Sequence, residues 1–583
     1  MQSFVVSTML HYYDNRLHYP IERRKQYKSS SKIRAGIRKI VRQTLRDSPH
    51  MLIDTTTGRL CNKAQRESAF ESLPIFKKLI SSMTTRIDRA RIKQEVQQYF
   101  QYVMLSHKWE NNEPLFEHVI HVTVHDLHLS PTHDKLQMFC KIVHEAGFNW
   151  AWSDTCCIET GKYDVHQESL VAMFKWYRGS ALVIVFLRGV SSSSQLGALA
   201  RSIWNTRGWT LQEYIAAKVI HFYTEDWTPY LNLELANHKE SSEVVLEMEQ
   251  ATGVSSEQLA ALRPGLTSIR EKLRLASTRQ TERVEDEAYS LLGIFSVTGI
   301  PAIYGEGEAA VGRLLSHVLA ASGDLSILAW TGESGSFNSC LPAHISVFNG
   351  PATSHLPAPI PDAEMERAVS ASYTSSFDLD VALRLYNRLR ELPPPWFAAS
   401  RMKLSCIAFE LPPLSSSRTR SGRVYRGDTL AFGMVEITTR HDLFRMGSLY
   451  LVHPWLDSLL EQEHLQGGAF MEEDVAPPPS PDTDDEDISD DEFDDEASFV
   501  SASETPLHPV RLPTVPVDRG TRARRLVARL RQPFGALLVT PVSTSRRVPD
   551  YRRVAADSLI TVRFQDNVSL TDILDNVRTL DVL

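Results

Sequence analysis

The chain has 583 residues, of which 42% are hydrophobic and 23% are charged, an ordinary composition for a soluble globular protein. This length exceeds what one hydrophobic core supports and predicts two to four domains. No apolar run approaches the roughly 18 residues of a membrane-spanning helix, and the start of the chain lacks the order of a secretory signal. The six Cys are scattered without a Cys-x-x-Cys pair, which argues against a disulfide framework or a structural zinc site. We therefore expect a cytoplasmic protein.

The negative net charge is concentrated in one segment. Residues 472–497 carry 14 acidic and no basic side chains, and removing them changes the formal net charge from −8 to +6. Such a composition predicts a disordered acidic linker, over residues 472–500. A basic, helix-like stretch follows in residues 519–532. It either neutralises the acidic linker or binds nucleic acid, and we favour the first interpretation.

Residues 1–100 are expected to form a helical N-terminal segment. "KIRAGIRKIVRQTLR" has apolar residues at helical spacing on a basic background, which is typical of a solvated basic helix. "MLIDTTTGRL" has the turn chemistry of a small hairpin, and a further helical pattern follows it up to residue 100.

From residue 101 onward, apolar runs alternate with amphipathic stretches. "YVMLSH", "FNWAWSDT" and "ALVIVFL" are predicted strands, and "DKLQMFCKIVHEAG" and "QESLVAMFKWYRGS" are predicted helices between them. Strand, helix, strand, helix, strand in this order predicts a parallel sheet covered on both faces. In such sheets, ligands bind beyond the carboxyl ends of the strands. Ser106, His107 and Trp109 end the first predicted strand, and Asp154 ends the second.

The rest of the chain changes character twice. Helical patterns continue to about residue 335, so that residues 101–335 form one predicted α/β domain. Short strand-like runs separated by Pro, Ser and Arg then predict a β-rich region in residues 336–471, which continues after the acidic linker in residues 501–583.

Four motifs in residues 100–330 resemble the HET domain, the fungal heterokaryon-incompatibility domain. They occur in order and at sensible spacing: "YVMLSHKWE", "WAWSDTCCIE" with "MFKWYRGSALVIVFL", "RGWTLQE", and "VEDEAYSLLGIFSV" with "IPAIYGEGEAAVGRLL". The first motif departs from the family, in which Gly usually follows the Trp, because Glu110 follows Trp109 here. Residues 335–583 resemble no family that we identify.

The resemblance implies an effector or signalling protein of fungal self/non-self recognition and innate-immunity-type cell death, expected to self-associate and not to bind nucleic acid or a membrane. HET domains have also been compared with the Toll/interleukin-receptor (TIR) domain, and the resemblance therefore implies a TIR/flavodoxin-like parallel sheet with helical additions. Several TIR domains cleave NAD with a Glu in the place that corresponds to Glu213. By this analogy the chain is an NAD nucleosidase with Glu213 as its catalytic residue, and NAD is its substrate.

One carboxylate is chemically sufficient for this reaction. The nicotinamide leaving group is already cationic and needs no general acid, so the carboxylate has only to hold the ribose and stabilise the oxocarbenium-like transition state. Trp204 and Trp209 are candidates for stacking on a ring of the substrate, and Arg207 for pairing with its pyrophosphate. Ser106 and His107 would line the opposite wall.

Two alternatives remain open. Trp209 and Glu213, four residues apart, would share one helix face and could simply pack that helix on the sheet. The chain would then be a non-enzymatic assembly module. A metal site from Asp154, Glu159 and His166 lacks a recognised ligand spacing, and we expect none.

Overall fold

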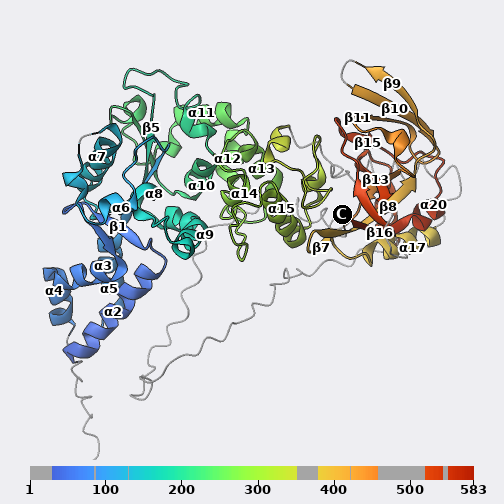
Figure 1. Cartoon of the computed structure of the whole chain (residues 1–583). Helices are drawn as coiled ribbons and strands as arrows, with labels where there is room; N and C mark the ends of the chain where they lie inside the picture. Colours follow the sequence, from blue (N-terminus) through green and yellow to red (C-terminus); the bar gives the residue numbers. More distant parts are fainter. Residues whose placement is uncertain are drawn as a thin grey trace, which may run out of the picture. The chain divides into compact units, whose positions relative to one another are not determined.

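The computed structural model describes residues 29–83, 87–128, 130–350, 379–419, 422–456, 519–542 and 549–583 (Figure 1). The chain divides into two compact units, Met1–Ala310 and Val311–Leu583. The predicted acidic linker and residues 1–28 lie outside the described residues. None of the helices in the described part combines the length and the apolar character that a membrane crossing requires.

The first unit begins with helices that share a small core: α2 (Ser30–Arg46), α3 (Lys63–Ser72), α4 (Pro74–Ser82) and α5 (Arg89–Phe100). The Ser29 side chain caps α2 by accepting a hydrogen bond from the Lys32 amide. Apolar side chains every four residues along α2 pack against the other helices around the buried Phe70. On the solvent side, Arg38 donates two hydrogen bonds, 2.5 and 2.7 Å long, to the Glu71 carboxylate of α3.

A six-stranded sheet forms the centre of the first unit. Its spatial order is β2-β1-β4-β3-β5-β6, with strands β1 (Met51–Asp54), β2 (Leu60–Asn62), β3 (Tyr102–His107), β4 (Trp150–Trp152), β5 (Leu182–Leu187) and β6 (Ile220–Thr224). The last four are parallel, and β1 is antiparallel to both β2 and β4. Their order, second-first-third-fourth along the chain, is that of the first four strands of flavodoxin-like sheets. The α/β fold class is thus confirmed.

Three details of the sheet differ from the sequence prediction. The hairpin β1–β2 extends the sheet through β4, and β6 adds an edge strand that the sequence patterns did not reveal. The predicted strand over residues 148–155 is too long. Only Trp150–Trp152 is a strand, because the Cys157 amide bonds to the Ser153 carbonyl, 2.9 Å away, and closes the short helix α8 (Asp154–Cys157).

Helices α7 (Pro131–Glu145), α9 (Tyr163–Gly179) and α10 (Gly208–Ala216) surround strand β3. Neighbouring side chains of a strand point to opposite faces, so Ser106 and His107 at the end of β3 face different helices. Ser106 contacts Glu213 of α10, whereas His107 contacts Glu113, which is bound to Lys135 of α7. Helices α7 and α10 therefore cover opposite faces of the sheet at this strand.

The remainder of the first unit is mostly helical, as expected. Short turns of helix occur at α6 (Phe116–Val119), η1 (Val124–Asp126), η2 (Ile203–Thr206), η3 (Tyr230–Asn232) and η4 (His238–Glu240). The longer elements are α11 (Ser242–Thr252), α12 (Ser256–Ala261), α13 (Ile269–Ser277), α14 (Asp286–Tyr289) and α15 (Ala309–Ser322), the last of which continues into the second unit.

The second unit contains a closed β-sheet, which confirms the prediction of a β-rich C-terminal region. Strands β12, β13, β14, β16 and β8 pair in this order, and β12 also pairs with β8, which closes the sheet into a barrel. The described strands are β7 (Trp396–Ala398), β8 (Arg401–Glu410), β9 (Ser415–Thr419), β10 (Gly422–Thr429), β11 (Gly433–Thr439), β12 (Tyr450–Pro454), β13 (Phe534–Val542), β14 (Asp550–Arg553), β15 (Ile560–Val562) and β16 (Val577–Val582).

Helices accompany this barrel: η5 (Leu325–Leu328), η6 (Ile345–Asn349), α17 (Leu379–Arg390), η7 (Leu443–Arg445), α19 (Arg519–Leu530) and α20 (Leu570–Asp575). The buried Arg553 guanidinium ties the start of the unit to β14. It lies 3.8 Å from the centre of the Trp330 ring and donates to the carbonyls of Leu328, Trp330 and Cys340. The basic stretch in residues 519–532 forms α19, as its pattern indicated.

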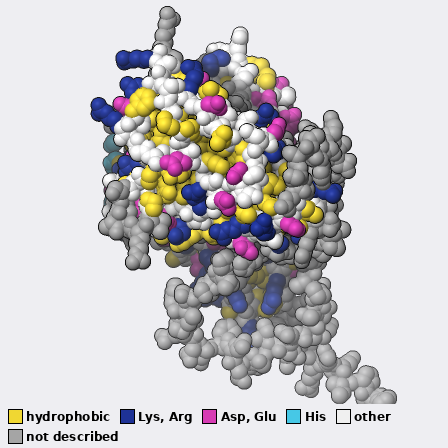
Figure 2. Space-filling view, turned by 90° about the vertical axis from the view of Figure 1, so that its right-hand side faces the viewer, with side chains coloured by type: hydrophobic (Ala, Val, Ile, Leu, Met, Phe, Trp, Pro, Cys, Tyr) yellow, Lys and Arg dark blue, Asp and Glu magenta, His cyan; other side chains and the backbone are white. Residues whose placement is uncertain are grey.

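Figure 2 shows one face of the molecule, on which hydrophobic, basic and acidic side chains are interspersed. Exposed apolar side chains in the second unit include Leu430, Met434 and Phe444. Scattered apolar side chains are normal on soluble proteins and do not by themselves indicate a binding surface.

The glycine of "LLGIF" provides a test of packing in the first unit. A Cβ atom on Gly293 would lie 2.2 Å from the Cβ of Phe174 in α9. The Gly293→Ala substitution therefore forces α9 away from the segment that contains residue 293. We expect a loss of about 1–3 kcal/mol in the free energy of unfolding, measured by urea denaturation.

The matched control is Gly36→Ala in α2, where a Cβ would meet no atom within 4 Å. Alanine favours helix more than glycine, so this variant should gain up to about 1 kcal/mol. Equal midpoints for the two variants would contradict the close approach of α9.

Candidate functional site

Polar side chains gather where the parallel strands end. His107 ends β3, Asp154 follows β4, Arg188 follows β5 and Glu225 follows β6. Arg188 lies 3.1 Å from a carboxylate oxygen of Glu110 and 4.0 Å from one of Glu225, so it links the loops after β3 and β6. This edge of a parallel sheet is where doubly wound proteins bind ligands.

Glu213 lies on the α10 side of β3 and is buried, with only 4% of its surface exposed. Its carboxyl oxygen Oε2 accepts a hydrogen bond from the Ser106 hydroxyl, and that hydroxyl accepts one from the Trp204 indole N–H at 2.7 Å. The Tyr177 hydroxyl of α9 also contacts Glu213 and donates to the Leu105 carbonyl at 3.1 Å. The structure therefore brings the predicted residues Ser106, Trp204 and Glu213 together.

The surroundings of Glu213 favour its neutral form. Burial raises the pKa of the Glu213 carboxyl to about 8, and the negative charge of Asp154 acts in the same direction. The hydrogen bond from Ser106, the contact with the Tyr177 hydroxyl and the positive charge of Arg207 oppose this rise without cancelling it. Glu213 is therefore mostly protonated at neutral pH. Strongly shifted carboxyls of this kind are found more often at functional sites than elsewhere.

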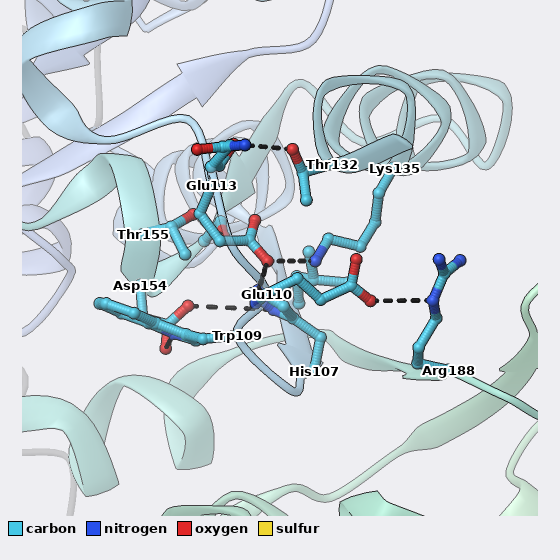
Figure 3. A network of polar contacts seen from close by, with 12 residues as sticks. His107, Trp109, Glu110, Glu113, Thr132, Lys135, Asp154, Thr155 and Arg188 are labelled. Carbon is cyan, nitrogen blue, oxygen red and sulfur yellow. Dashed lines mark hydrogen bonds and ion pairs between the residues drawn. The ribbon is translucent and has the colours of Figure 1, made fainter. Parts of the chain in front are cut away.

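A second buried cluster lies on the α7 side of β3 (Figure 3). The His107 ring has 1% of its side chain exposed and lies 3.6 Å from Glu113, which Lys135 of α7 contacts at 2.5 Å. Burial alone would raise the pKa of Glu113, but the contacts with His107 and Lys135 outweigh it and lower the pKa to about 2. Neither His107 ring nitrogen makes a hydrogen bond with a described residue.

Asp154 connects the two clusters. Its Oδ2 atom accepts a hydrogen bond of 2.6 Å from the Trp109 indole, and its Oδ1 atom lies 3.9 Å from Nδ1 of His107 (Figure 3). Its charge also acts on Glu213 across the sheet. Trp109 is 37% exposed, so part of its side chain is open to solvent while its indole N–H is bonded to Asp154. Trp109 is thus the predicted aromatic residue that is best placed to meet a ligand.

Glu110, at the position where the family usually has Gly, has specific contacts. Its amide donates a 3.0 Å hydrogen bond to Glu113, and its carboxylate faces Arg188. The loop turns at the next-but-one residue, Asn112, which has a φ of 64°. The left-handed residue of this loop is therefore Asn112, and the Glu110 carboxylate is paired with Arg188.

Two predicted ligand-binding residues have other partners. Arg207 lies 3.3 Å from the Glu282 carboxylate, at the surface end of α10. Trp209 donates a hydrogen bond to the Asp286 carboxylate of α14, which also accepts one from the Tyr304 hydroxyl at 2.9 Å. Trp209 thus joins the third and fourth sequence motifs.

The Gly-x-Gly turn of the fourth motif holds a carboxylate of the chain itself. The amides of Gly305 and Gly307, both with positive φ, donate to the same oxygen of Glu285, at 2.7 and 3.1 Å. These two amides form a small anion-binding turn, and the Glu285 carboxylate occupies it. The motif is therefore a fastening between α14 and the start of α15.

The sequence reasoning missed Glu113, Lys135, Tyr177 and Arg279. Lys135 could have been found from the sequence, because it occupies a position in the apolar stripe of α7. The structure shows that its side chain is buried there. Glu113 and Arg279 lie in loops without periodicity, and their positions emerge only from the fold. In the described ranges, no group of three or more His, Cys, Asp or Glu side chains is arranged to hold a metal ion.

The fold and this edge define a doubly wound α/β domain with a buried carboxyl site. Residues 102–200 match the family model described as "Heterokaryon incompatibility protein (HET)". The chain is also similar to "Vegetative incompatibility protein HET-E-1" of Podospora anserina, with 32% identity over 228 residues. That match covers 37% of this chain and 16% of the relative, so the chain spans only a small part of its length. No solved structure matches the chain. These matches support a HET-type domain within this chain.

The protonation of Glu213 predicts how stability depends on pH. Because the folded state raises this carboxyl pKa from 4.5 to about 8, the charged form is disfavoured and stability falls as pH rises between these values. Glu213→Gln removes the titrating group. The free energy of unfolding of Glu213→Gln, relative to that of the wild type, should therefore rise by up to about 4 kcal/mol between pH 4.5 and pH 8.5.

The comparison uses urea denaturation at pH 5, 7 and 8.5, with Glu117→Gln, an exposed carboxylate, as the control. A difference between Glu213→Gln and the wild type that does not change with pH would show that Glu213 is ionised throughout this range.

Proposed function

We propose that this chain is an effector of heterokaryon incompatibility or of innate-immunity-type cell death in the cytoplasm. The HET family match and the name of the Podospora relative support this biological role. The biochemical step that we propose is TIR-like cleavage of NAD at the nicotinamide–ribose bond, with Glu213 as the catalytic carboxylate. The observation that carries this step is a buried, perturbed carboxyl beside the edge of the sheet where ligands bind.

The reaction requires an ionised Glu213. An oxocarbenium-like transition state is stabilised by a carboxylate, and a neutral carboxyl gives little of this stabilisation. In the single chain, the carboxyl is buried against Ser106 and favours its neutral form. We therefore propose that the single chain is latent, and that self-association moves α10 so that water, substrate or a neighbouring chain ionises Glu213.

The exposed Trp109 ring supports a planar substrate at the same edge. A partly exposed indole offers a stacking surface for a nicotinamide or adenine ring. The proposed recognition thus uses Trp109 for stacking and Glu213 for the ribose, with Asp154 and His107 between them.

A second candidate function is a non-enzymatic assembly module. The observation that favours it is the hydrogen-bonded chain Trp204–Ser106–Glu213, which is complete without any ligand and holds α10 to β3. A role of Glu213 in packing alone would explain the same contacts.

The two candidate functions predict different changes in cellular NAD and in cell viability. The full chain and its Glu213→Gln variant, expressed at equal levels in a heterologous host and joined to an inducible dimeriser, are compared for cellular NAD and viability. For the enzyme, we expect dimerised wild type to deplete NAD at least about tenfold faster than the variant, because the amide cannot supply the carboxylate charge.

Glu117→Gln serves as the matched control and should behave as wild type. Cell death with unchanged NAD in both dimerised chains would support the assembly module and refute the NAD step. Viable cells with unchanged NAD after dimerisation would refute the proposal that self-association is the trigger.

A further inference from the structure

A half-buried arginine, Arg279, contacts the start of the helix that carries Glu213. Nη1 of Arg279, just after α13, donates to the Arg207 carbonyl and to the Thr210 hydroxyl, both at 2.9 Å. Residues 206–208 and 280 also exchange backbone hydrogen bonds, of 2.6 and 2.9 Å. The N-terminal end of α10 is therefore fastened to the segment that contains Arg279.

The Arg279 guanidinium lies near enough to Glu213 for the charge of that carboxylate to act on it. Thr210 precedes Glu213 by three residues, so the two side chains are neighbours on α10. Nη2 of Arg279 is buried and makes no hydrogen bond with a described residue. Burial lowers the pKa of Arg279 to about 10, and the charge of Glu213 opposes this lowering. Arg279 therefore has a buried N–H donor that no described residue accepts, and the Glu213 carboxyl, whose charge acts on it, is mostly neutral.

No carboxylate of the described part of the chain forms an ion pair with Arg279 within 4 Å, whereas Arg207 pairs with Glu282. The opposite end of α10 is held by Lys239, whose ammonium donates to the carbonyls of Tyr214 and Ala217 at 2.6 and 2.7 Å. Both cations grip the backbone of α10. Only Arg279 keeps a buried donor free near Glu213.

We propose that Arg279 is a positioning residue for Glu213: it fixes α10 through Arg207 and Thr210, and its Nη2 atom takes up the Glu213 carboxylate when that group ionises. The catalytic consequence rests on the proposed NAD cleavage, but the pairing itself does not. Arg279 would then lower the free energy of the active state, in which Glu213 is ionised. In the latent state, in which Glu213 is neutral, it would leave the site buried.

Four charged or titratable groups face Glu213 from the elements around it. Asp154 of α8 disfavours its ionisation, whereas Tyr177 of α9, Arg207 before α10 and Arg279 after α13 favour or accommodate it. A test has to separate Arg279 from the other cation, Arg207, which is the matched control because it also acts on Glu213 but pairs with Glu282.

The test is a double-mutant cycle in the full chain: wild type, Glu213→Gln, Arg279→Gln and the double variant, unfolded with urea at pH 5.5 and 9.5. We expect a coupling of about tenfold in the folding equilibrium constant, or about 1.4 kcal/mol, at pH 9.5, where Glu213 is ionised. At pH 5.5 the coupling should be less than about twofold. The Arg207→Gln cycle should give less than half of the Arg279 coupling at pH 9.5.

Equal coupling at the two pH values would show a purely structural contact, and no coupling at either would refute the pairing. If Arg279→Gln does not fold, the cycle is run with Arg279→Lys, which keeps the charge but not the forked donor and should lose part of the coupling at pH 9.5 only.

The same variants are assayed for NAD cleavage after forced dimerisation, where Arg279→Gln should shift the pH profile upward and Arg279→Lys should restore most of it. A pH-dependent coupling without any NAD cleavage would refute the proposed function and leave the Arg279–Glu213 pairing intact.

Discussion

Burying the Glu213 carboxyl against Ser106 is unfavourable for its charged form, and the surrounding residues are arranged around that constraint. The carboxyl is held neutral by burial and by Asp154, while the hydroxyl of Ser106, oriented by Trp204, supplies its hydrogen bond. A neutral, hydrogen-bonded carboxyl is a stable part of the interior, whereas an ionised one would require water or a cation. The neutral form of Glu213 is therefore a direct consequence of where the carboxyl lies.

Strand β3 separates two chemically different clusters that are one residue apart in sequence. On one face, Ser106 binds a neutral carboxyl, and on the other, His107 lies beside the ionised Glu113 and its partner Lys135. Asp154, at the edge of the sheet, faces both. A change in the charge or position of Asp154 therefore alters both clusters together. Trp109, which bonds to Asp154 and is partly exposed, connects this edge of the sheet with solvent.

Much of the first unit was predictable, because strands covered on both faces are continuous apolar runs and the helices between them are amphipathic. Strand β6 was missed because "IHFYT" is an edge strand with alternating burial, and its apolar run is short. Ser106, Trp204 and Glu213 were predicted as site residues and do meet, whereas Arg207 and Trp209 bond to Glu282 and Asp286. Arg279 could not be predicted, since its partners lie about 70 residues away and no local pattern links them.

Measuring the protonation state of Glu213 in the full chain is the most direct test of the proposed latent state. Infrared difference spectra between the wild type and Glu213→Gln, recorded from pH 6 to 10, report the carboxyl band of this one residue. A buried, neutral Glu213 predicts a protonated-carboxyl band at pH 7 that converts to a carboxylate band near pH 8. A carboxylate band already complete at pH 6 would contradict the neutral, latent state from which the proposed mechanism starts.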